Sequence, residues 1–259
     1  MTERFVIPQY RVTAINLGNI TLDKSAMTYM SGVGTMVTVP VWGAAVEGNG
    51  LKILVDTGIG QPEKYNFPYH PVWQGKDETL EAALAELGWG LNDIDIVINS
   101  HLHYDHSENN PLLPNARFFV SLREWEYAKN PISTQKWLYG HNWDREPLSV
   151  MNYVLIDYDL FDVVPGIKTI ETPGHSAGHQ SILVQTSEGL LCIAGDAACF
   201  MENFTRPTPP GGLTSVEQAL SSIEKMRRYG DRIFMNHDPE IKKYQEGGFP
   251  EVPKAIGDG

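Results

Sequence analysis

The segment HLHYDH at residues 101–106 places three imidazoles and one carboxylate within six positions. A two-residue spacing puts His101 and His103 on the same side of an extended chain, and the turn after them brings Asp105 and His106 toward a second position nearby. Imidazole nitrogens and carboxylate oxygens are ligands for zinc, iron or manganese, and no thiolate is present for a structural cysteine site. We therefore predict a metal site here rather than an exposed His-rich loop.

Three more candidate ligands follow further along the chain: His175 in TPGHSAGH, Asp196 in AGDA and His237 in MNHD. A lone histidine or aspartate usually has a structural role, so each residue means little alone. Their order and their sequence contexts, taken together with residues 101–106, indicate that they are further metal ligands.

Short apolar strands are expected to position these residues. The stretch 93–100 (DIDIVINS) is β-branched and apolar on alternate positions, which suits a buried strand that leads directly into the histidine motif. Residues 36–46 and 51–56 predict a hairpin around Gly-Asn-Gly, ending at Asp56. We also expect strands at 116–121, within 167–197 and at 232–238.

Helices are predicted between these strands. One has Asp77 as its N-cap and ends at Gly88; the others cover 122–128 and 214–230, the last capped by Thr214 or Ser215. Residues 128–162 show no clear pattern. Alternating strands and helices with both sheet faces covered predict an α/β layered architecture in one domain over residues 1–259.

Composition limits the classes of function. The chain has 259 residues and a formal net charge of −12, which argues against nucleic acid as a partner. Its two cysteines are too few for a disulfide framework. The N-terminus has no apolar segment typical of a secretory signal, and no run of eighteen apolar residues is present. We expect a cytoplasmic enzyme with no membrane partner; whether it forms a homodimer is open.

The order of the histidines and aspartates resembles that of the metallo-β-lactamase superfamily, in which HxHxDH is followed by His, Asp and His. The resemblance runs from VPVWGAAVEGNGLKILVDTG to the final NHD. Within the superfamily, NSHLHYDHSENN, TPGHSAGHQSILV, GDA followed by ENF, and a last HD are similar to N-acyl homoserine lactonases, which quench bacterial quorum signals. HxHxDH is strongly specific for the fold, whereas neighbouring lactonases and hydrolases share the flanking strings.

This resemblance implies an αβ/βα four-layer sandwich with a two-metal site at one edge. It assigns His101, His103 and His175 to the first metal. It assigns Asp105, His106 and His237 to the second, with Asp196 as the bridge. Zinc is the expected metal, with iron, manganese or cobalt as alternatives. The resemblance also implies that Asp56 steadies the ligand loop and that His179 is a structural hydrogen-bonding residue.

The implied activity is hydrolysis of the ester ring of N-acyl homoserine lactones by a hydroxide that bridges the two metals. Asp105 would orient this hydroxide and then protonate the leaving oxygen. The alternative is a dinuclear-metal hydrolase of another lactone or cyclic ester or amide, such as a pyridoxolactonase-like catabolic enzyme. A thioesterase is less favoured, because that family adds a helical region after the last histidine and only 22 residues follow His237.

Other branches of the superfamily fit less well. A nuclease would need a basic surface. Redox diiron members carry glutamate at the position of His103 and a fused flavin domain. Secreted β-lactamases normally have a signal peptide. A non-catalytic relic is disfavoured because every expected ligand is present.

One position departs from the lactonase pattern. Three residues after the bridging aspartate, these lactonases commonly have a tyrosine that binds the substrate carbonyl, but here Cys199 is followed by Phe200. We place both residues at the substrate site as predictions, although a cysteine after a strand is most often a small buried apolar residue. Either the metals alone stabilise the oxyanion, or a tyrosine from elsewhere substitutes, or the substrate differs.

Aromatic and methionine side chains give a second indication of the substrate. They either line a pocket for an acyl chain or ring, or they belong to the core, and the sequence does not distinguish these roles. The residues concerned are Met27, Tyr29, Met30, Trp137, Tyr139 and Trp143.

Overall fold

The computed structural model describes residues 6–140 and 151–254. Its helices are α1 (Leu80–Glu86), α2 (Tyr104–Ser107), α3 (Leu122–Lys129), α4 (Met201–Thr205) and α5 (Val216–Tyr229). The strands of the first half are β1 (Arg11–Asp23), β2 (Met36–Gly48), β3 (Leu51–Val55), β4 (Val72–Trp73), β5 (Ile96–Ile98), β6 (Arg117–Ser121) and β7 (Tyr153–Ile156). Those of the second half are β8 (Phe161–Val164), β9 (Ile167–Glu171), β10 (Gln180–Thr186), β11 (Gly189–Ile193) and β12 (Arg232–Phe234).

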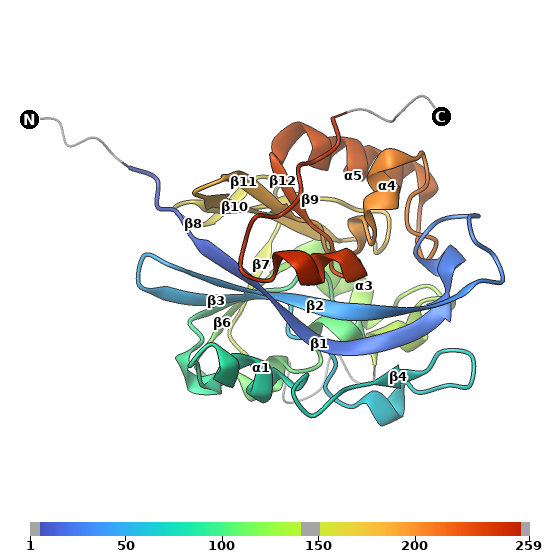
Figure 1. Cartoon of the computed structure of the whole chain (residues 1–259), viewed down its shortest axis with the longest axis horizontal. Helices are drawn as coiled ribbons and strands as arrows, with labels where there is room; N and C mark the ends of the chain where they lie inside the picture. The colour runs from blue at the N-terminus through green and yellow to red at the C-terminus, as the bar shows by residue number, and fades with distance from the viewer. Residues whose placement is uncertain (1–5, 141–150, 255–259) are drawn as a thin grey trace, which may run out of the picture.

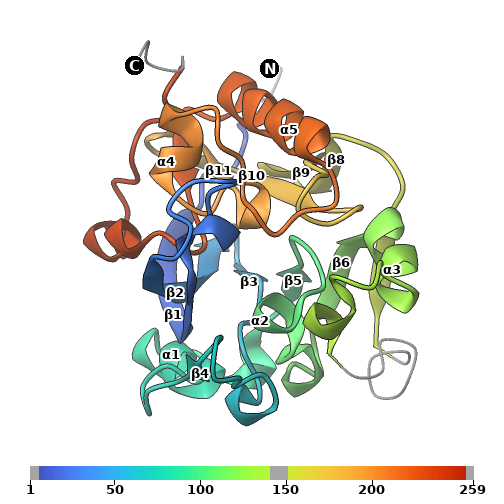
Figure 2. The ribbon, with the colours of Figure 1, turned by 90° about the vertical axis from the view of Figure 1, so that its right-hand side faces the viewer.

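These strands form two sheets that lie face to face (Figure 1). The described part of the first sheet has the order β4-β1-β2-β3-β5-β6-β7, and that of the second has the order β12-β11-β10-β9-β8. In Figure 2, α5 lies at the top, α1 at the bottom and α2 between them. The arrangement is helix, sheet, sheet, helix, which confirms the predicted αβ/βα sandwich.

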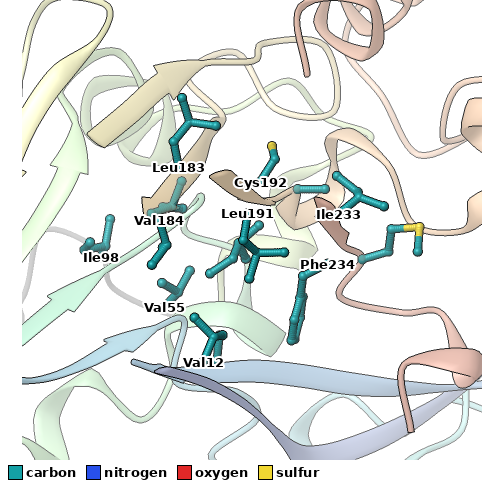
Figure 3. Packing of buried hydrophobic residues seen from close by; sticks show 14 of the residues in the cluster. Val12, Val55, Ile98, Leu183, Val184, Leu191, Cys192, Ile233 and Phe234 are labelled. Atoms are coloured by element: carbon teal, nitrogen blue, oxygen red, sulfur yellow. The ribbon is translucent and has the colours of Figure 1, made fainter. Parts of the chain in front are cut away.

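The main core fills the space between the sheets, as Figure 3 shows. Val55 and Ile98 from the first sheet and Val184 and Leu191 from the second belong to the same buried cluster. β-branched residues suit these positions because they pack well on a pleated surface. Burial of these apolar side chains is the main favourable contribution to folding.

Smaller contacts hold the helices on the outer faces. Leu80 and Leu84 of α1 pack with Leu54 and Val97 of the first sheet. Ile223 and Met226 of α5 join the main core, while the polar face of that helix points outward. No helix in residues 6–140 and 151–254 has the length and apolar character needed to cross a lipid bilayer.

The predicted elements agree with the structure except at some boundaries. The hairpin of β2 and β3 and the strand at β5 are confirmed. The first helix begins later than predicted, because Thr79, not Asp77, is its N-cap; the Thr79 side chain accepts a hydrogen bond from the N–H of Ala82. Ser215 caps α5, in agreement with one of the two predicted caps.

Parallel strands position the candidate site. β3 and β5 are parallel neighbours in one sheet, and β11 and β12 are parallel neighbours in the other. Carboxyl ends of parallel neighbours meet at one edge of a sheet, where α/β proteins form their sites. Asp56 follows β3, His101 follows β5, Asp196 follows β11 and His237 follows β12, while His175 lies in the connection from β9 to β10.

Candidate metal centre

All seven residues predicted as ligands are buried, and the fold brings them together. His101, His103, His106 and His237 are at most 2% exposed. The others, Asp105, His175 and Asp196, retain 5–7% exposure, so the cluster is closed on most sides.

The first group consists of His101, His103 and His175. One candidate ligand atom from each residue lies within 4.8 Å of those of the other two. His175 Nε2 is 3.0 Å from His103 Nδ1, and the rings of His101 and His103 have centroids 4.4 Å apart. Three imidazoles at such separations fit a single ion between them.

The second group consists of Asp105, His106 and His237, again with ligand atoms within 4.8 Å of one another. Asp105 Oδ2 is 3.6 Å from His106 Nε2 and 3.7 Å from His237 Nε2. Asp105 and His106 both belong to α2, the single helical turn that directly follows His103 and lies between α1 and α5 in Figure 2.

Asp196 lies between the two groups. Its Oδ2 is 3.3 Å from His175 Nε2, while its Oδ1 is 3.3 Å from His106 Nε2 and 3.2 Å from His237 Nε2. Each carboxylate oxygen therefore faces a different group, which is the arrangement that a bridging ligand requires.

The donor set fits metal ions. Among the described residues, several buried atoms of the cluster have no hydrogen-bond partner: His101 Nε2, His103 Nε2, His106 Nε2, His175 Nδ1, His237 Nε2 and Asp196 Oδ1. A buried polar atom without a partner costs about 1–3 kcal/mol, so the concentration of such atoms in one place fits a binding site for cations. The seven side chains offer the imidazole and carboxylate ligands that zinc and similar metals take.

Protonation states in the cluster also favour a cation. Burial and the neighbouring histidines hold the pKa of His101 and His103 well below the usual value, so both imidazoles are neutral with free lone pairs. Burial disfavours the charged form of Asp196, but the surrounding histidines hold its pKa well below the usual range. In the second group burial lowers the pKa of His106 and His237, but the carboxylates of Asp196 and Asp105 outweigh it and raise both, so this part of the cluster attracts positive charge, which a cation would supply.

Asp56 contacts the second group through His106, at the ring nitrogen that points away from the cluster. Its Oδ1 accepts a hydrogen bond from the N–H of Ser100 at 2.7 Å, and its Oδ2 accepts one from Ser100 Oγ at 2.7 Å and lies 2.8 Å from His106 Nδ1. An Nδ1–H donated to Asp56 leaves Nε2 of His106 free to face the cluster. Asp56 has a φ of 61°, an uncommon conformation for a residue other than glycine and one that occurs at functional sites.

Sequence reasoning missed two partners of this framework. His237 Nδ1 is held by the carbonyl oxygen of Pro40 at 2.8 Å, and Asn236 Nδ2 reaches Asp56 Oδ2 at 3.3 Å. Pro40 gives no sequence signal, because a backbone carbonyl exists at every position. For Asn236, the available signal was its place in the NHD string, directly before His237.

Gly195 directly precedes Asp196, and its position requires a glycine. Its φ is +57°, and a Cβ at this position would lie 2.5 Å from His179 Nε2 and 2.8 Å from Ser100 Cβ. The glycine of the GDA string therefore allows the Asp196 loop to approach the first sheet closely.

The structure buries Cys199 at 1% exposure, in a cluster that includes Met27, Val41 and Tyr104. Burial and the nearby carboxylates of Asp196 and Asp105 raise the pKa of its thiol well above the usual value. A protonated thiol is a weak hydrogen-bond donor. Phe200 is half-buried beside this cluster, and substrate contact by either residue stays a prediction.

The aromatic and methionine residues separate into two classes. Met27 is 6% exposed and Tyr139 4%, so both are core. Tyr29, Met30 and Trp137 are 40%, 77% and 42% exposed, which leaves them available to a ligand. Trp143 lies outside the described residues.

Sequence reasoning also missed Tyr104. Its ring stacks on Tyr65 with centroids 3.8 Å apart, and its hydroxyl lies 3.0 Å from His70 Nε2. Its position inside HLHYDH, next to Asp105, was the available signal.

Comparisons with known proteins agree with this geometry. The model of the metallo-beta-lactamase superfamily matches residues 38–235. The N-acyl homoserine lactonase of Bacillus cereus is 31% identical over 257 residues, covering 92% of this chain and 96% of that protein. The N-acyl homoserine lactonase AttM of Azorhizobium caulinodans is 33% identical over 201 residues, covering 73% of this chain and 72% of its own.

Solved structures give the same result. A mutant of Bacillus thuringiensis AiiA with N-decanoyl-L-homoserine bound at the active site is 29% identical, with a TM-score of 0.76 over 90% of this chain and 95% of its own. AidC, a dizinc quorum-quenching lactonase, shares the fold with a TM-score of 0.68 at 19% identity, covering 97% and 94%. The family match over most of the chain and the homology to lactonases lead to one conclusion: this chain belongs to the metallo-β-lactamase superfamily of hydrolases.

Proposed function

We propose that this protein is a metal-dependent lactonase that opens the ester ring of N-acyl homoserine lactones. The observation that carries the proposal is the placement of Asp196, with one oxygen facing each of two ligand groups. The lactonases of Bacillus cereus and Azorhizobium caulinodans support the choice of substrate. A structure 29% identical to this chain holds the product N-hexanoyl-L-homoserine at its catalytic metal centre.

We assign two divalent ions to the seven side chains, zinc first, with iron, manganese or cobalt as alternatives. His101, His103 and His175 would hold one ion and Asp105, His106 and His237 the other, with Asp196 shared. When bound, such a pair lowers the pKa of water, polarises a carbonyl oxygen and neutralises charge on a leaving oxygen.

The protein's own residues orient the reaction. Asp105 belongs to the second group and retains 7% exposure, so we assign its carboxylate to the side of the cluster that water and the ring ester would reach. We assign it to take the proton of the attacking water and to donate that proton to the leaving alkoxide oxygen. Asp56 keeps His106 in one tautomer and one orientation throughout.

A second candidate keeps the site and changes the ring. Cys199 supplies a buried, protonated thiol where the lactonases commonly have tyrosine, so only a weak hydrogen bond to the substrate carbonyl is available from this position. This observation favours a lactone other than an acyl homoserine lactone, or another cyclic ester or amide, as the alternative substrate.

The test is turnover by the metal-loaded protein in weak buffer, followed by proton release. The panel holds short and long N-acyl homoserine lactones, simple γ- and δ-lactones, an aromatic lactone and a glutathione thioester. We expect turnover of the acyl homoserine lactones that disappears on chelation and returns with added metal. Turnover of the aromatic or simple lactones alone would contradict the proposed substrate and support the alternative, and turnover of the thioester alone would contradict both.

A further inference from the structure

Glu124 is a fully buried carboxylate that belongs to neither ligand group. It lies in the first turn of α3 at 0% exposure, and the Oγ of Ser121 caps that helix by accepting the N–H of Glu124. An acidic side chain is rarely buried to this degree unless its oxygens are fully hydrogen-bonded. Its partners therefore indicate what it does.

Four donors reach Glu124, two at each oxygen. Oε1 accepts the backbone N–H of Leu102 at 3.1 Å and the hydroxyl of Tyr139 at 2.8 Å. Oε2 accepts the hydroxyl of Ser176 at 2.6 Å and the backbone N–H of Gly178 at 3.1 Å. Burial raises the pKa of the Glu124 carboxyl, and all four hydrogen bonds oppose that rise.

The two oxygens serve two different ligand loops. Leu102 stands between His101 and His103, and Ser176 directly follows His175. One carboxylate therefore joins the loop after β5, which carries two ligands of the first group, to the loop between β9 and β10, which carries the third.

Neighbouring contacts strengthen this junction. The ring of Tyr139 packs edge-on against His103, with centroids 4.6 Å apart, and Gln135 Nε2 donates to the carbonyl oxygen of His175 at 2.7 Å. A Cβ at Gly178 would collide with the backbone of Glu124, so glycine is required for the close approach of this loop to α3.

The second group has supports other than Glu124, one of which, Asp56, also reaches the first group through Ser100, whose Oγ lies 3.0 Å from His101 Nδ1. His106 is held by Asp56 and His237 by the carbonyl of Pro40. None of the four hydrogen bonds described for Glu124 goes to Asp105, His106 or His237 or to a residue adjacent to them in sequence.

We infer that Glu124 is a positioning residue that sets the metal affinity of the group His101, His103 and His175, independently of the group Asp105, His106 and His237. The inference rests on the metal site of the proposed function. Its physical basis is that only a carboxylate offers two acceptor oxygens. In Glu124→Gln the amide NH₂ would replace one of these oxygens and face N–H and O–H donors that it cannot accept from. The ligand loop on that side would lose its hydrogen bonds to residue 124, while the side-chain volume stays the same.

The experiment measures zinc dissociation constants by competition with a chromophoric chelator. Two backgrounds separate the groups: His237→Ala disables the second group, and His103→Ala disables the first. In the His237→Ala background we expect Glu124→Gln to weaken zinc binding about 10–100-fold, the usual effect of removing support from behind metal ligands. In the His103→Ala background we expect no change, whereas Asp56→Asn should weaken binding there.

Tyr139→Phe and Ser176→Ala provide milder variants if Glu124→Gln folds poorly. Each removes one donor from one oxygen, and we expect each to weaken zinc binding by a smaller factor, only in the His237→Ala background. Equal weakening in both backgrounds, or none in the His237→Ala background, would overturn the inference. If Glu124→Gln weakens zinc binding only in the His237→Ala background but no lactone is cleaved, the proposed function fails and the inference about Glu124 stands. If lactones are cleaved but Glu124→Gln does not affect the two backgrounds differently, the proposed function stands and the inference fails.

Discussion

His179 Nε2 accepts a hydrogen bond from the backbone N–H of Asp196 at 3.0 Å. Its other ring nitrogen, Nδ1, lies 2.9 Å from the hydroxyl oxygen of Thr172. Because both nitrogens have protein partners, His179 has no lone pair left for a metal. This confirms the expectation that the residue is a structural hydrogen-bonding group, and it shows what His179 holds in place: the backbone at Asp196.

This arrangement predicts acid sensitivity. Burial and the nearby His175 lower the pKa of His179 to about 3, whereas the unfolded chain has an ordinary value near 6.5. Between these values the unfolded state binds the extra proton, so this group's contribution to stability is complete above pH 6.5 and is lost as the pH falls toward 3. The loss is about 1.4 kcal/mol per pH unit in that window.

Urea unfolding of the metal-free protein at several pH values between 4 and 7 measures this effect. We expect His179→Gln to be less stable than the native sequence at pH 7 but to lose less stability on acidification. Identical pH slopes for the two proteins would show that His179 is not the group responsible.

Replacing Asp105 or His106 by alanine should abolish turnover and lower the metal content, while the fold persists. Both residues stand in the second group, and the loss of one ligand leaves that group with two residues of its own. Metal analysis and circular dichroism check the two effects. His70→Ala is the matched control, since His70 belongs to neither group and should retain the full metal content. Full activity in either ligand variant would contradict the two-metal assignment.

Cys199→Ala should preserve turnover and cost about 1 kcal/mol of stability, because the thiol is buried in an apolar cluster. Cys199→Ser should cost more, about 1–3 kcal/mol, since it buries a hydroxyl among apolar groups. Steady-state kinetics and thermal unfolding separate these outcomes. A tenfold fall in kcat for Cys199→Ala at unchanged stability would instead place Cys199 in contact with substrate.

Trp137→Ala should raise KM for long-chain lactones and leave kcat nearly unchanged. Trp137 is 42% exposed and packs edge-on against His70, whose ring nitrogen is hydrogen-bonded to the hydroxyl of Tyr104, the residue before Asp105. An apolar surface there would bind an acyl chain away from the reacting atoms. Trp73→Ala on β4 is the control, similarly exposed at 47%. Equal effects of the two variants would argue against an acyl-chain contact at Trp137.

Much of the site was predictable from local spacing. HLHYDH, the GDA string and NHD indicated the candidate ligands and their order, because metal-binding residue types in clusters at strand ends are visible without a fold. The apolar runs that became β3 and β5 were equally clear, since strand periodicity is a local property.

Relations across long sequence separations required the folded chain. Asp196 faces both groups only because β11 lies beside β12 and the second sheet meets the first at one edge. The burial of Tyr139 against Glu124, rather than its exposure to a ligand, depends on loops that no spacing rule connects. The residue types and their order therefore came from the sequence. The resemblance already implied the division of the candidate ligands between two groups, whereas the distances within each group and the hydrogen bonds of Asp56 and Glu124 came from tertiary packing, because burial and hydrogen-bond partners exist only once distant segments meet.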